Sequence, residues 1–309
     1  MMVKKSLLIF ISLILIFAGV NLHAQPSIRG IYINQGTLEN LSYLKQLINE
    51  SKAVGINTFV IDLAKETKNY RRNVQLVQDS GIRYVARIVV FPDGGRSQQI
   101  KSMDYWKKRF KLVETAIRYG ADEIQLDYIR YSSKQAPSAQ NAKDVKQVIK
   151  WFKGEMAAYK IPLQIDIFGE VSFKESPRIG QNIQLFADTI DGACPMVYPS
   201  HYHPYQTHSK EPYNTVYKSL IALKDQFGEK LPFKLVPFVE ASNYHYKLSS
   251  AQKAKYVLSQ IRAAEDAKAD GWYVWSPQNI YKSLFSALKN RNDVASKSKG
   301  AGPRKVAFE

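Results

Sequence analysis

The sequence has a single cysteine, Cys194, among its 309 residues. One thiol cannot form an intramolecular disulfide or build a zinc site that needs several thiolates. Because this thiol lies in an apolar run, we interpret it as a buried core residue rather than a nucleophile. The histidines number only five, and neither His201 nor His203 belongs to a helical pair spaced four residues apart. We therefore predict no metal site and no cofactor.

Acidic residues are scarce beside basic ones, with 27 Asp and Glu against 44 Lys and Arg and a formal net charge of +17. Such a surplus is compatible with nucleic acid, anionic membrane or acidic glycan as a partner. It affects how charged partners approach the protein and does not indicate the fold. No nucleic-acid-binding motif accompanies the basic residues, so we expect no nucleic-acid partner. The surplus favours an anionic polysaccharide. A hydrophobic share of 45% excludes global disorder.

The N-terminal segment has the pattern of a secretory signal. Lys4 and Lys5 precede an uncharged run from Leu7 to Val20, and a small Ala24 follows. The run is shorter than the roughly 20 apolar residues that a membrane-spanning helix needs. We predict a signal peptide over residues 1–24, followed by export to the periplasm or the medium without a stable membrane anchor.

After this segment, short β-rich runs alternate with longer helical patterns. The predicted strands are Gly30–Ile33, Thr58–Asp62, Tyr84–Phe91, Glu123–Asp127, Leu163–Phe168, Gly192–Tyr198, Lys234–Val239 and Gly271–Trp275. The predicted helices are Leu38–Val54, Val74–Ser80, Tyr105–Tyr119, Asp144–Tyr159, Asn182–Ala187, Thr215–Phe227, Ala251–Ala269 and Tyr281–Lys289. Strict alternation of this kind predicts parallel strands joined by crossover helices.

Eight such units within residues 25–289 fit an α/β fold of the TIM (β/α)8 barrel type, as a single domain. A doubly wound open sheet is the alternative, and it is expected to carry a glycine-rich phosphate turn after its first strand. Here the first strand runs into Asn34-Gln35-Gly36, without a glycine cluster. The basic tail over residues 290–309 shows no periodicity, and we predict that it is disordered.

Acidic residues stand at several predicted strand ends, where a barrel of this type has its active site. Asp127 ends the fourth strand with its side chain on the inward-facing parity, and Asp62 ends the second. Asp166 lies in the fifth strand, Glu170 follows just beyond it, and Glu240 ends the seventh. An isolated strand-end acid is as often structural as functional, but acids at four strand ends indicate an active site.

The neighbouring residues allow both a structural and a catalytic role for Asp127. A buried arginine needs a carboxylate, so Asp127 could pair with Arg87 on the third strand or with Arg130. Such a pair is compatible with catalysis because it keeps an aspartate ionised. The sixth and eighth strands place Tyr198 and Trp275 at the predicted mouth, and aromatic rings suit the apolar faces of sugars.

Several segments together resemble a bacterial glycosyl hydrolase domain family that was long filed as a domain of unknown function. They are Val60–Leu63, Ala86–Phe91, Asp122–Arg130, Asp166–Gly169, Ile179–Gln181, Pro195–Tyr202 and Gly271–Trp272. The resemblance covers nearly the whole mature chain and is most specific around Asp127 and over Met196–Tyr202. It implies a TIM barrel distantly related to alpha-amylase-like hydrolases, with Asp127 and Asp166 as the pair that the family supports.

Two departures from the family pattern leave the second carboxylate open. The family has Lys-Asp directly after the second strand, whereas Ala64 intervenes here before Lys65 and Glu66. Its seventh strand ends in Trp-Leu-Gln, whereas this one reads Phe238–Glu240.

We predict an exported glycoside hydrolase that acts on a bacterial or environmental polysaccharide, with Asp127 as nucleophile or base. The first choice for the acid is Glu170, by analogy with the fifth-strand glutamate of amylase-like barrels, followed by Asp166 or Glu240. The predicted substrate-binding residues are Asp62, Arg87, Arg130, Tyr198, His201, Tyr202 and Trp275.

Two alternatives make different demands on the same residues. A non-catalytic glycan-binding barrel would keep the aromatic mouth but would not require a pair of acids within about 10 Å of each other. A metal-dependent polysaccharide deacetylase would require His201 or His203 to converge with Asp127 or Asp166 within metal-bonding distance.

Overall fold

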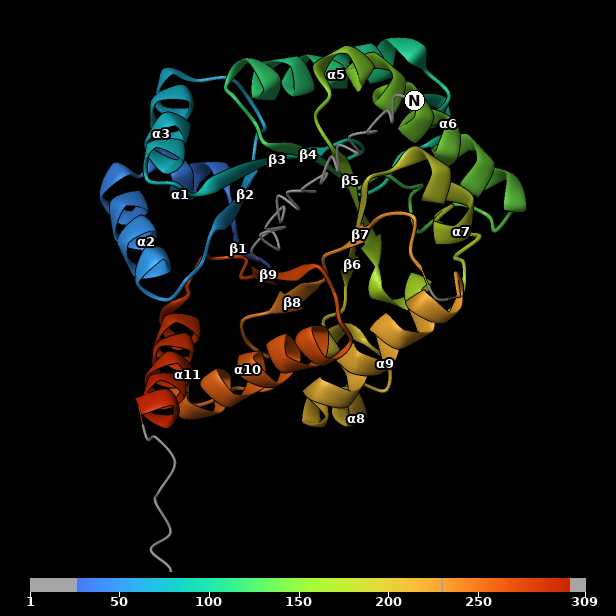
Figure 1. The fold of residues 1–309 in the computed structure, drawn as a ribbon. Coiled ribbons are helices and arrows are strands. Elements are labelled where there is room, and N and C mark those ends of the chain that lie inside the picture. The colour runs from blue at the N-terminus through green and yellow to red at the C-terminus, as the bar shows by residue number, and fades with distance from the viewer. Residues whose placement is uncertain (1–26, 229, 301–309) are drawn as a thin grey trace, which may run out of the picture.

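The computed structural model describes residues 27–228 and 230–300, except for the side chains of residues 294–300. The predicted signal peptide at residues 1–24 and the last nine residues lie outside the described residues. The described part forms a ring of strands surrounded by helices (Figure 1).

The strands form one closed parallel sheet, which confirms the predicted TIM barrel. They are β1 (Ile28–Ile33), β2 (Thr58–Asp62), β3 (Arg83–Val89), β4 (Glu123–Asp127), β5 (Leu163–Phe168), β6 (Gly192–Met196), β7 (Lys234–Leu235), β8 (Phe238–Glu240) and β9 (Gly271–Trp275). Pairing of β1 with both β2 and β9, and of β5 with β6, closes the sheet. Segments β7 and β8 share one barrel position beside β6, and they are separated at Pro237, which has no N–H to donate.

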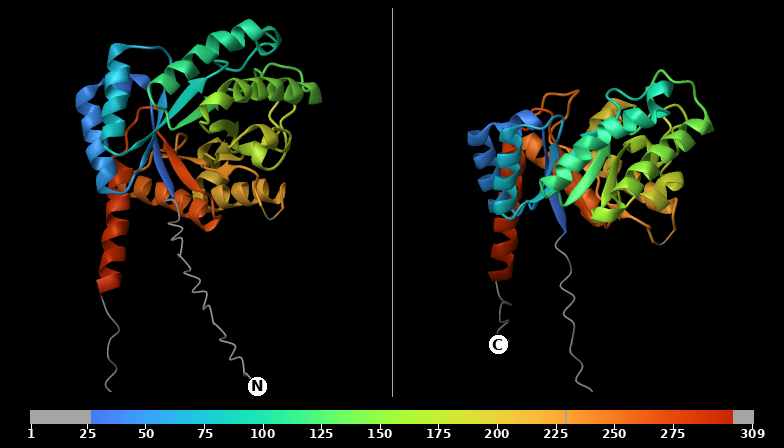
Figure 2. Two further views of the ribbon diagram at one scale, coloured as in Figure 1. Left: turned by 45° about the horizontal axis from the view of Figure 1, so that its top comes forward. Right: turned by 90° about the horizontal axis from the view of Figure 1, so that it is seen from above.

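Helices cover the outside of the barrel between successive strands (Figures 1 and 2). The longer ones are α2 (Leu41–Ala53), α3 (Lys68–Asp79), α5 (Met103–Arg118), α6 (Ala139–Met156), α9 (Pro212–Asp225), α10 (Ser250–Asp266) and α11 (Lys282–Gly300). The shorter ones are α1 (Gln35–Glu39), α4 (Ser97–Ile100), α7 (Ile183–Phe186) and α8 (Tyr205–Lys210). No helix in the described part of the chain is both long and apolar enough to cross a membrane.

The first predicted helix, Leu38–Val54, is two helices in the structure. Asn40 separates α1 from α2, and its side chain accepts a hydrogen bond from the amide of Tyr43. This is the contact by which an asparagine caps the start of a helix, so the chain begins a new helix at Leu41.

Helix α11 corrects the prediction for the C-terminal tail. It continues to Gly300, so residues 290–300 are helical rather than disordered, while residues 301–309 lie outside the description. The segment from 290 to 299 contains neither proline nor glycine, so nothing in it ends the helix. Arg291 also holds Glu265 of α10 at 2.7 Å. Apolar periodicity reports packing against a core, and it therefore gave no signal for a helix that projects beyond the barrel (Figure 2).

Alternating side chains of the strands divide the interior into two cores. One lies between the sheet and the helices and includes Phe152 and Trp272, which are buried. The other fills the barrel itself with Val60, Val85 and Tyr273, among others. Cys194 belongs to this inner core, where burial raises the pKa of its thiol well above the ordinary value, which disfavours a nucleophilic role.

The outer core predicts a large cost for losing one of its aromatic rings. Phe152 is fully buried and meets Phe110 and Trp151 edge-on, with ring centroids 5.7 and 5.2 Å away. We expect Phe152→Ala to lower the free energy of unfolding by about 3–5 kcal/mol, measured by urea denaturation. Tyr159→Ala is the control, because that ring is 47% exposed, and it should change stability by no more than about 0.5 kcal/mol. Equal effects of the two variants would contradict this account of the core.

Candidate active site

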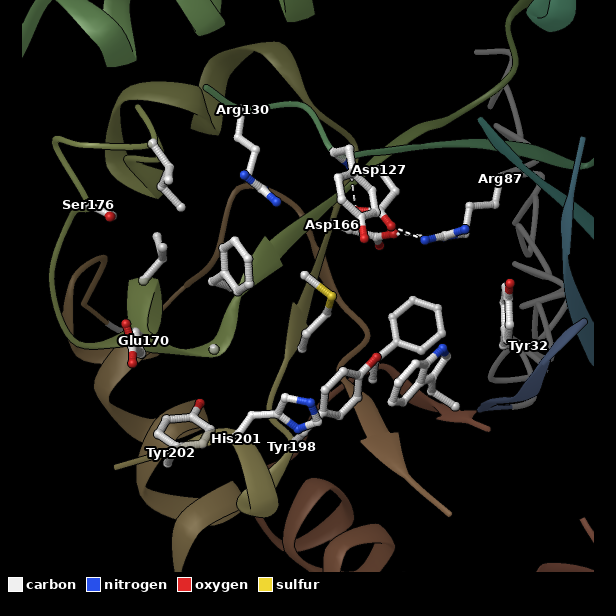
Figure 3. Close-up of a pocket in the computed structure, with 18 residues that line it drawn as sticks. Tyr32, Arg87, Asp127, Arg130, Asp166, Glu170, Ser176, Tyr198, His201 and Tyr202 are labelled. Atoms are coloured by element: carbon white, nitrogen blue, oxygen red, sulfur yellow. Dashed lines mark hydrogen bonds and ion pairs between the residues drawn. The ribbon is translucent and has the colours of Figure 1, made fainter. Parts of the chain in front are cut away.

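One arginine binds three aspartates at the C-terminal ends of neighbouring strands. Arg87 of β3 donates through Nη1 to Asp62 of β2 and through Nη2 to Asp127 of β4. Its Nε donates to Oδ2 of Asp166 of β5 at 3.4 Å. Register explains the meeting, because Arg87 lies opposite Asp62 and Asp127 lies two residues further along the adjacent strand. The predicted pair of Arg87 and Asp127 is confirmed (Figure 3).

The surroundings of Asp166 favour its protonated form. The residue is 1% exposed, and burial raises the pKa of its carboxyl well above the ordinary range. The negative charge of Asp127 raises that pKa further, and the contact with Arg87 only partly opposes the two effects. Oδ1 of Asp166 is buried without a hydrogen-bond partner within the described residues. A proton on Oδ1 would therefore form no hydrogen bond with a described protein group.

Asp127 differs from Asp166 because both of its oxygens accept hydrogen bonds. Oδ2 binds Arg87, and Oδ1 accepts the backbone N–H of Tyr128 at 2.5 Å. Tyr128 has a positive φ of 52°, which is uncommon for a residue with a side chain. The turn that follows β4 thus directs an amide back onto the carboxylate.

A cavity of about 450 Å³ opens beside this cluster. All but two of the predicted site residues line it, namely Asp127, Asp166, Glu170, Arg87, Arg130, Tyr198, His201, Tyr202 and Trp275. The exceptions are Asp62 and Glu240. Asp62 is taken up by Arg87 and by the hydroxyl of Tyr32, which donates to it at 2.5 Å.

Glu240 does not line the cavity, and its carboxylate is fully used by the protein. It accepts the amide of Ser200 at 2.8 Å, the hydroxyl of Ser200 at 2.6 Å and the hydroxyl of Tyr256 at 2.6 Å. The side chain is completely buried, with Nδ1 of His201 3.7 Å from Oε2. This geometry gives Glu240 a positioning role, because it fixes the loop after β6 that carries His201.

Glu170 lies in the short 3-10 turn Gly169–Ser172 that follows β5. Its side chain is exposed, and none of its contacts within the described residues is a side-chain hydrogen bond. Figure 3 shows it in the cavity apart from the pair formed by Asp127 and Asp166. The residue that the sequence favoured as the acid is thus the more solvated of the candidates.

Aromatic rings form another wall of the cavity. Tyr198 stacks on Trp275 with centroids 4.9 Å apart and an interplanar angle of 17°. The ring of His201 packs against both of them. Burial, and next the charge of Asp166, raise the pKa of Tyr198 well above the ordinary value, so its hydroxyl remains a donor.

The sequence analysis missed several cavity residues, among them Tyr32, Tyr128 and Phe168. Tyr32 lies beneath the guanidinium of Arg87, whose carbon is 5.3 Å from the ring centroid. Strand parity could have identified both Phe168, which shares the inward side of β5 with Asp166, and Tyr32, which lies with Ile28 on the inward side of β1. The position of Tyr128 depends on its positive φ, which no pattern in the sequence indicated.

Neither His201 nor His203 contacts Asp127 or Asp166. His201 contacts Ser200, Glu240 and neighbouring aromatic rings, while His203 packs against Tyr205 outside the lining of the cavity. Across the described residues, no group of three or more His, Cys, Asp or Glu side chains is placed to hold a metal ion. The convergence that a deacetylase would require is not present among them.

A closed (β/α)8 barrel with acids and aromatic rings around a cavity at its C-terminal mouth is an architecture common among enzymes. The family described as "Putative glycosyl hydrolase domain" matches residues 98–281, and the chain belongs to this family. No sequence among the curated proteins matches the chain.

Solved structures with a similar fold include three bacterial barrels. The spore cortex-lytic enzyme SleL of Bacillus cereus has a TM-score of 0.60 and 9% identity over 85% of this chain and 73% of its own. The class V chitinase of Pseudomonas fluorescens has a TM-score of 0.60 and 11% identity, over 85% and 98%. The chitinase of Chromobacterium violaceum has a TM-score of 0.59 and 10% identity, also over 85% and 98%. At these identities the likeness shows the fold.

The raised pKa of Asp166 predicts how stability depends on pH. A carboxyl that binds its proton more tightly in the folded state loses stability as pH rises from about 3.9 through the folded pKa. Asp166→Asn removes this loss. We expect its free energy of unfolding, relative to the wild type, to increase between pH 3 and pH 8 by more than about 1.4 kcal/mol, equivalent to a tenfold change in proton affinity. Urea denaturation at both pH values measures the difference.

Asp144→Asn is the control with the opposite sign. Burial alone would raise the pKa of Asp144, but hydrogen bonds from Gln140 and Tyr131 bring it below the ordinary value. Its stabilising effect is present above the unfolded pKa and is lost at low pH, so this variant should fall further below the wild type as pH rises. If both variants shift in the same direction, the interpretation of Asp166 is wrong.

Proposed function

We propose that this protein hydrolyses glycosidic bonds of a polysaccharide in the cavity at the mouth of its barrel. One observation carries the proposal: Asp127 and Asp166 bind the same guanidinium within the cavity, and the surroundings of Asp166 favour its protonated form. Glycoside hydrolysis needs a pair of carboxyl groups, one protonated and one ionised, on either side of the reacting bond.

Asp166 is the proposed general acid. Its buried carboxyl would donate a proton to the glycosidic oxygen as the bond to the leaving group breaks. Asp127 is the proposed nucleophile, and the hydrogen bonds from Arg87 and from the amide of Tyr128 orient it. This order of preference places Asp166 ahead of Glu170, because Asp166 is buried beside Asp127 and Arg87, whereas Glu170 is exposed and lies apart from them.

The proposed substrate is a polysaccharide, and the protein would meet it after export to the periplasm or the medium. Trp275 and Tyr198 offer ring faces to a sugar, and His201 and the hydroxyl of Tyr198 offer polar contacts to its hydroxyl groups. Membership of the glycosyl hydrolase family supports this class. The names of the similar barrels, which include chitinases and a cortex-lytic enzyme, support it as well.

A glycan-binding barrel without catalysis is the second candidate. The observation in its favour is that Arg87 already binds three carboxylates, as a purely structural cluster would. A binding barrel does not require two acids at hydrolytic spacing, however. Because Asp127 and Asp166 contact adjacent nitrogens of one guanidinium, we expect them to lie close together.

Substitution of the two aspartates separates the candidates. We expect Asp127→Asn and Asp166→Asn each to lower kcat by about 10²- to 10⁴-fold, because each removes an acid–base or nucleophilic group. Release of reducing ends from a panel of bacterial and plant polysaccharides measures the loss. Glu170→Gln should stay within about tenfold of the wild type. If Asp127→Asn retains wild-type turnover on a confirmed substrate while folded, the assignment fails.

The position of the pair also predicts the stereochemistry of the product. Retaining enzymes place their carboxyl groups about 5–5.5 Å apart, whereas inverting enzymes need roughly 6.5–9.5 Å to admit a water molecule. Asp127 and Asp166 contact adjacent nitrogens of Arg87, so we expect the shorter spacing and retention. Proton NMR of the first product should show the anomer of the substrate before mutarotation. Release of the opposite anomer would make Asp127 a base rather than a nucleophile.

A further inference from the structure

We propose that the cavity recognises a sugar that carries a carboxylate, and that Arg130 receives that group. This inference rests on the proposed function for the choice of a glycan, and it extends that function by naming the substrate class.

Arg130 has two of its three guanidinium nitrogens, Nη2 and Nε, without a protein acceptor among the described residues. Its Nη1 donates to the carbonyl of Tyr131 at 2.9 Å and lies 3.5 Å from the carbonyl of Asp93. Its Nη2 and Nε bind no protein acceptor among the described residues, where no acidic side chain lies within 4.0 Å of this guanidinium. Arg87, by contrast, is matched by three aspartates.

The surroundings hold the Arg130 guanidinium in one place. Its carbon lies 5.1 Å from the ring centroid of Tyr128 and 5.1 Å from that of Phe168. A Cβ at Gly94 would come within 2.5 Å of Nη1, so a glycine is needed for the guanidinium to fit here. Figure 3 shows the charged end of Arg130 pointing into the cavity. The free edge therefore faces the space that a ligand would occupy.

Because Arg130 is partly buried, the absence of a contacting carboxylate is energetically unfavourable. Burial lowers the pKa of Arg130, because a charged guanidinium loses hydration there, and the charges of Tyr128, Asp127 and Asp93 oppose this only in part. None of these groups forms an ion pair with Arg130 within the described residues. A ligand anion would restore that interaction. Within the described lining, Arg87 and Arg130 are the two guanidinium groups, and lysine is absent. Since Arg87 is occupied, Arg130 is the guanidinium in this lining that is available to an anionic substituent.

The remaining chemistry favours a sugar carboxylate over other anions. The Nε and Nη2 of one arginine match the two oxygens of a carboxylate, and one cation balances one negative charge rather than the two of a phosphate monoester. The ring of Phe168 is 39% exposed beside the guanidinium, and it can contact the apolar face of the same sugar. Uronic acids and sugars with a carboxylate-bearing ether both have this combination.

Matched glycans test the inference without catalysis. Oligosaccharides of glucuronic acid, of galacturonic acid and of N-acetylmuramic acid with N-acetylglucosamine are immobilised beside their methyl esters. Binding is measured with the Asp127→Asn variant, which leaves the ligands intact. We expect at least one acidic glycan to bind about ten- to a hundredfold more tightly than its ester, the effect of one charge-assisted hydrogen-bond pair.

Substitutions in the same background assign the preference to one residue. Arg130→Gln should bring the acidic glycan and its ester to within about twofold of each other, and Arg130→Lys should keep part of the preference. Arg178→Gln is the control, because this exposed arginine lies outside the cavity lining and binds only the carbonyl of Gln135. It should leave the preference unchanged. The comparison of acid with ester stands even if Arg130→Gln fails to fold.

Three results would overturn the inference: no preference for acid over ester in any pair, a preference that survives Arg130→Gln, or tighter binding of phosphorylated glycans than of carboxylated ones. These outcomes are independent of hydrolysis. If the Asp127 and Asp166 variants retain turnover while Arg130 still selects acids, only the proposed reaction is wrong. If neutral glycans are hydrolysed without any preference for acids, only the inference is wrong.

Discussion

The guanidinium of Arg87 connects three neighbouring strands, and the arrangement of the site depends on it. Asp62, Asp127 and Asp166 would repel one another at the barrel mouth without a cation between them. Burial is the main reason why Asp166, the deepest of them, favours a proton, and the charge of Asp127, which one guanidinium cannot fully offset, adds to it. Burial and charge imbalance together underlie the proposed roles of proton donor and nucleophile.

A second set of contacts fixes the wall of the cavity that carries His201 and Tyr202. Glu240 ends β8 and binds both the amide and the hydroxyl of Ser200, which fixes the turn that presents His201. Gly169 is needed at the end of β5, because a Cβ there would come within 2.0 Å of the hydroxyl of Tyr202. The walls of the cavity are therefore set in part by Glu240 and Ser200, which lie outside its lining.

The sequence predicted the features that depend on the alternation of inward and outward side chains along strands. It did not predict the features that depend on local backbone geometry. Strands β4, β5 and β9 have the predicted bounds, and inward parity brought Asp127 and Asp166 to the mouth together. The sequence placed Glu240 at the end of a strand but could not show that Ser200 and Tyr256 occupy its carboxylate. The loop conformation beyond β5 decides the exposure of Glu170, and a helical extension beyond the barrel such as residues 290–300 leaves no periodic signal.

The unpartnered oxygen of Asp166 has a consequence for the evolution of this barrel. A buried carboxylate oxygen without a hydrogen-bond partner among the described residues lowers the stability of the fold, and the proposed reaction would give selection a reason to retain it. A duplicated copy that lost its reaction would be free to replace Asp166 with an amide or an apolar residue, and it would gain stability by doing so. Among descendants of this chain, the residue at position 166 would then distinguish active enzymes from barrels that have lost the reaction.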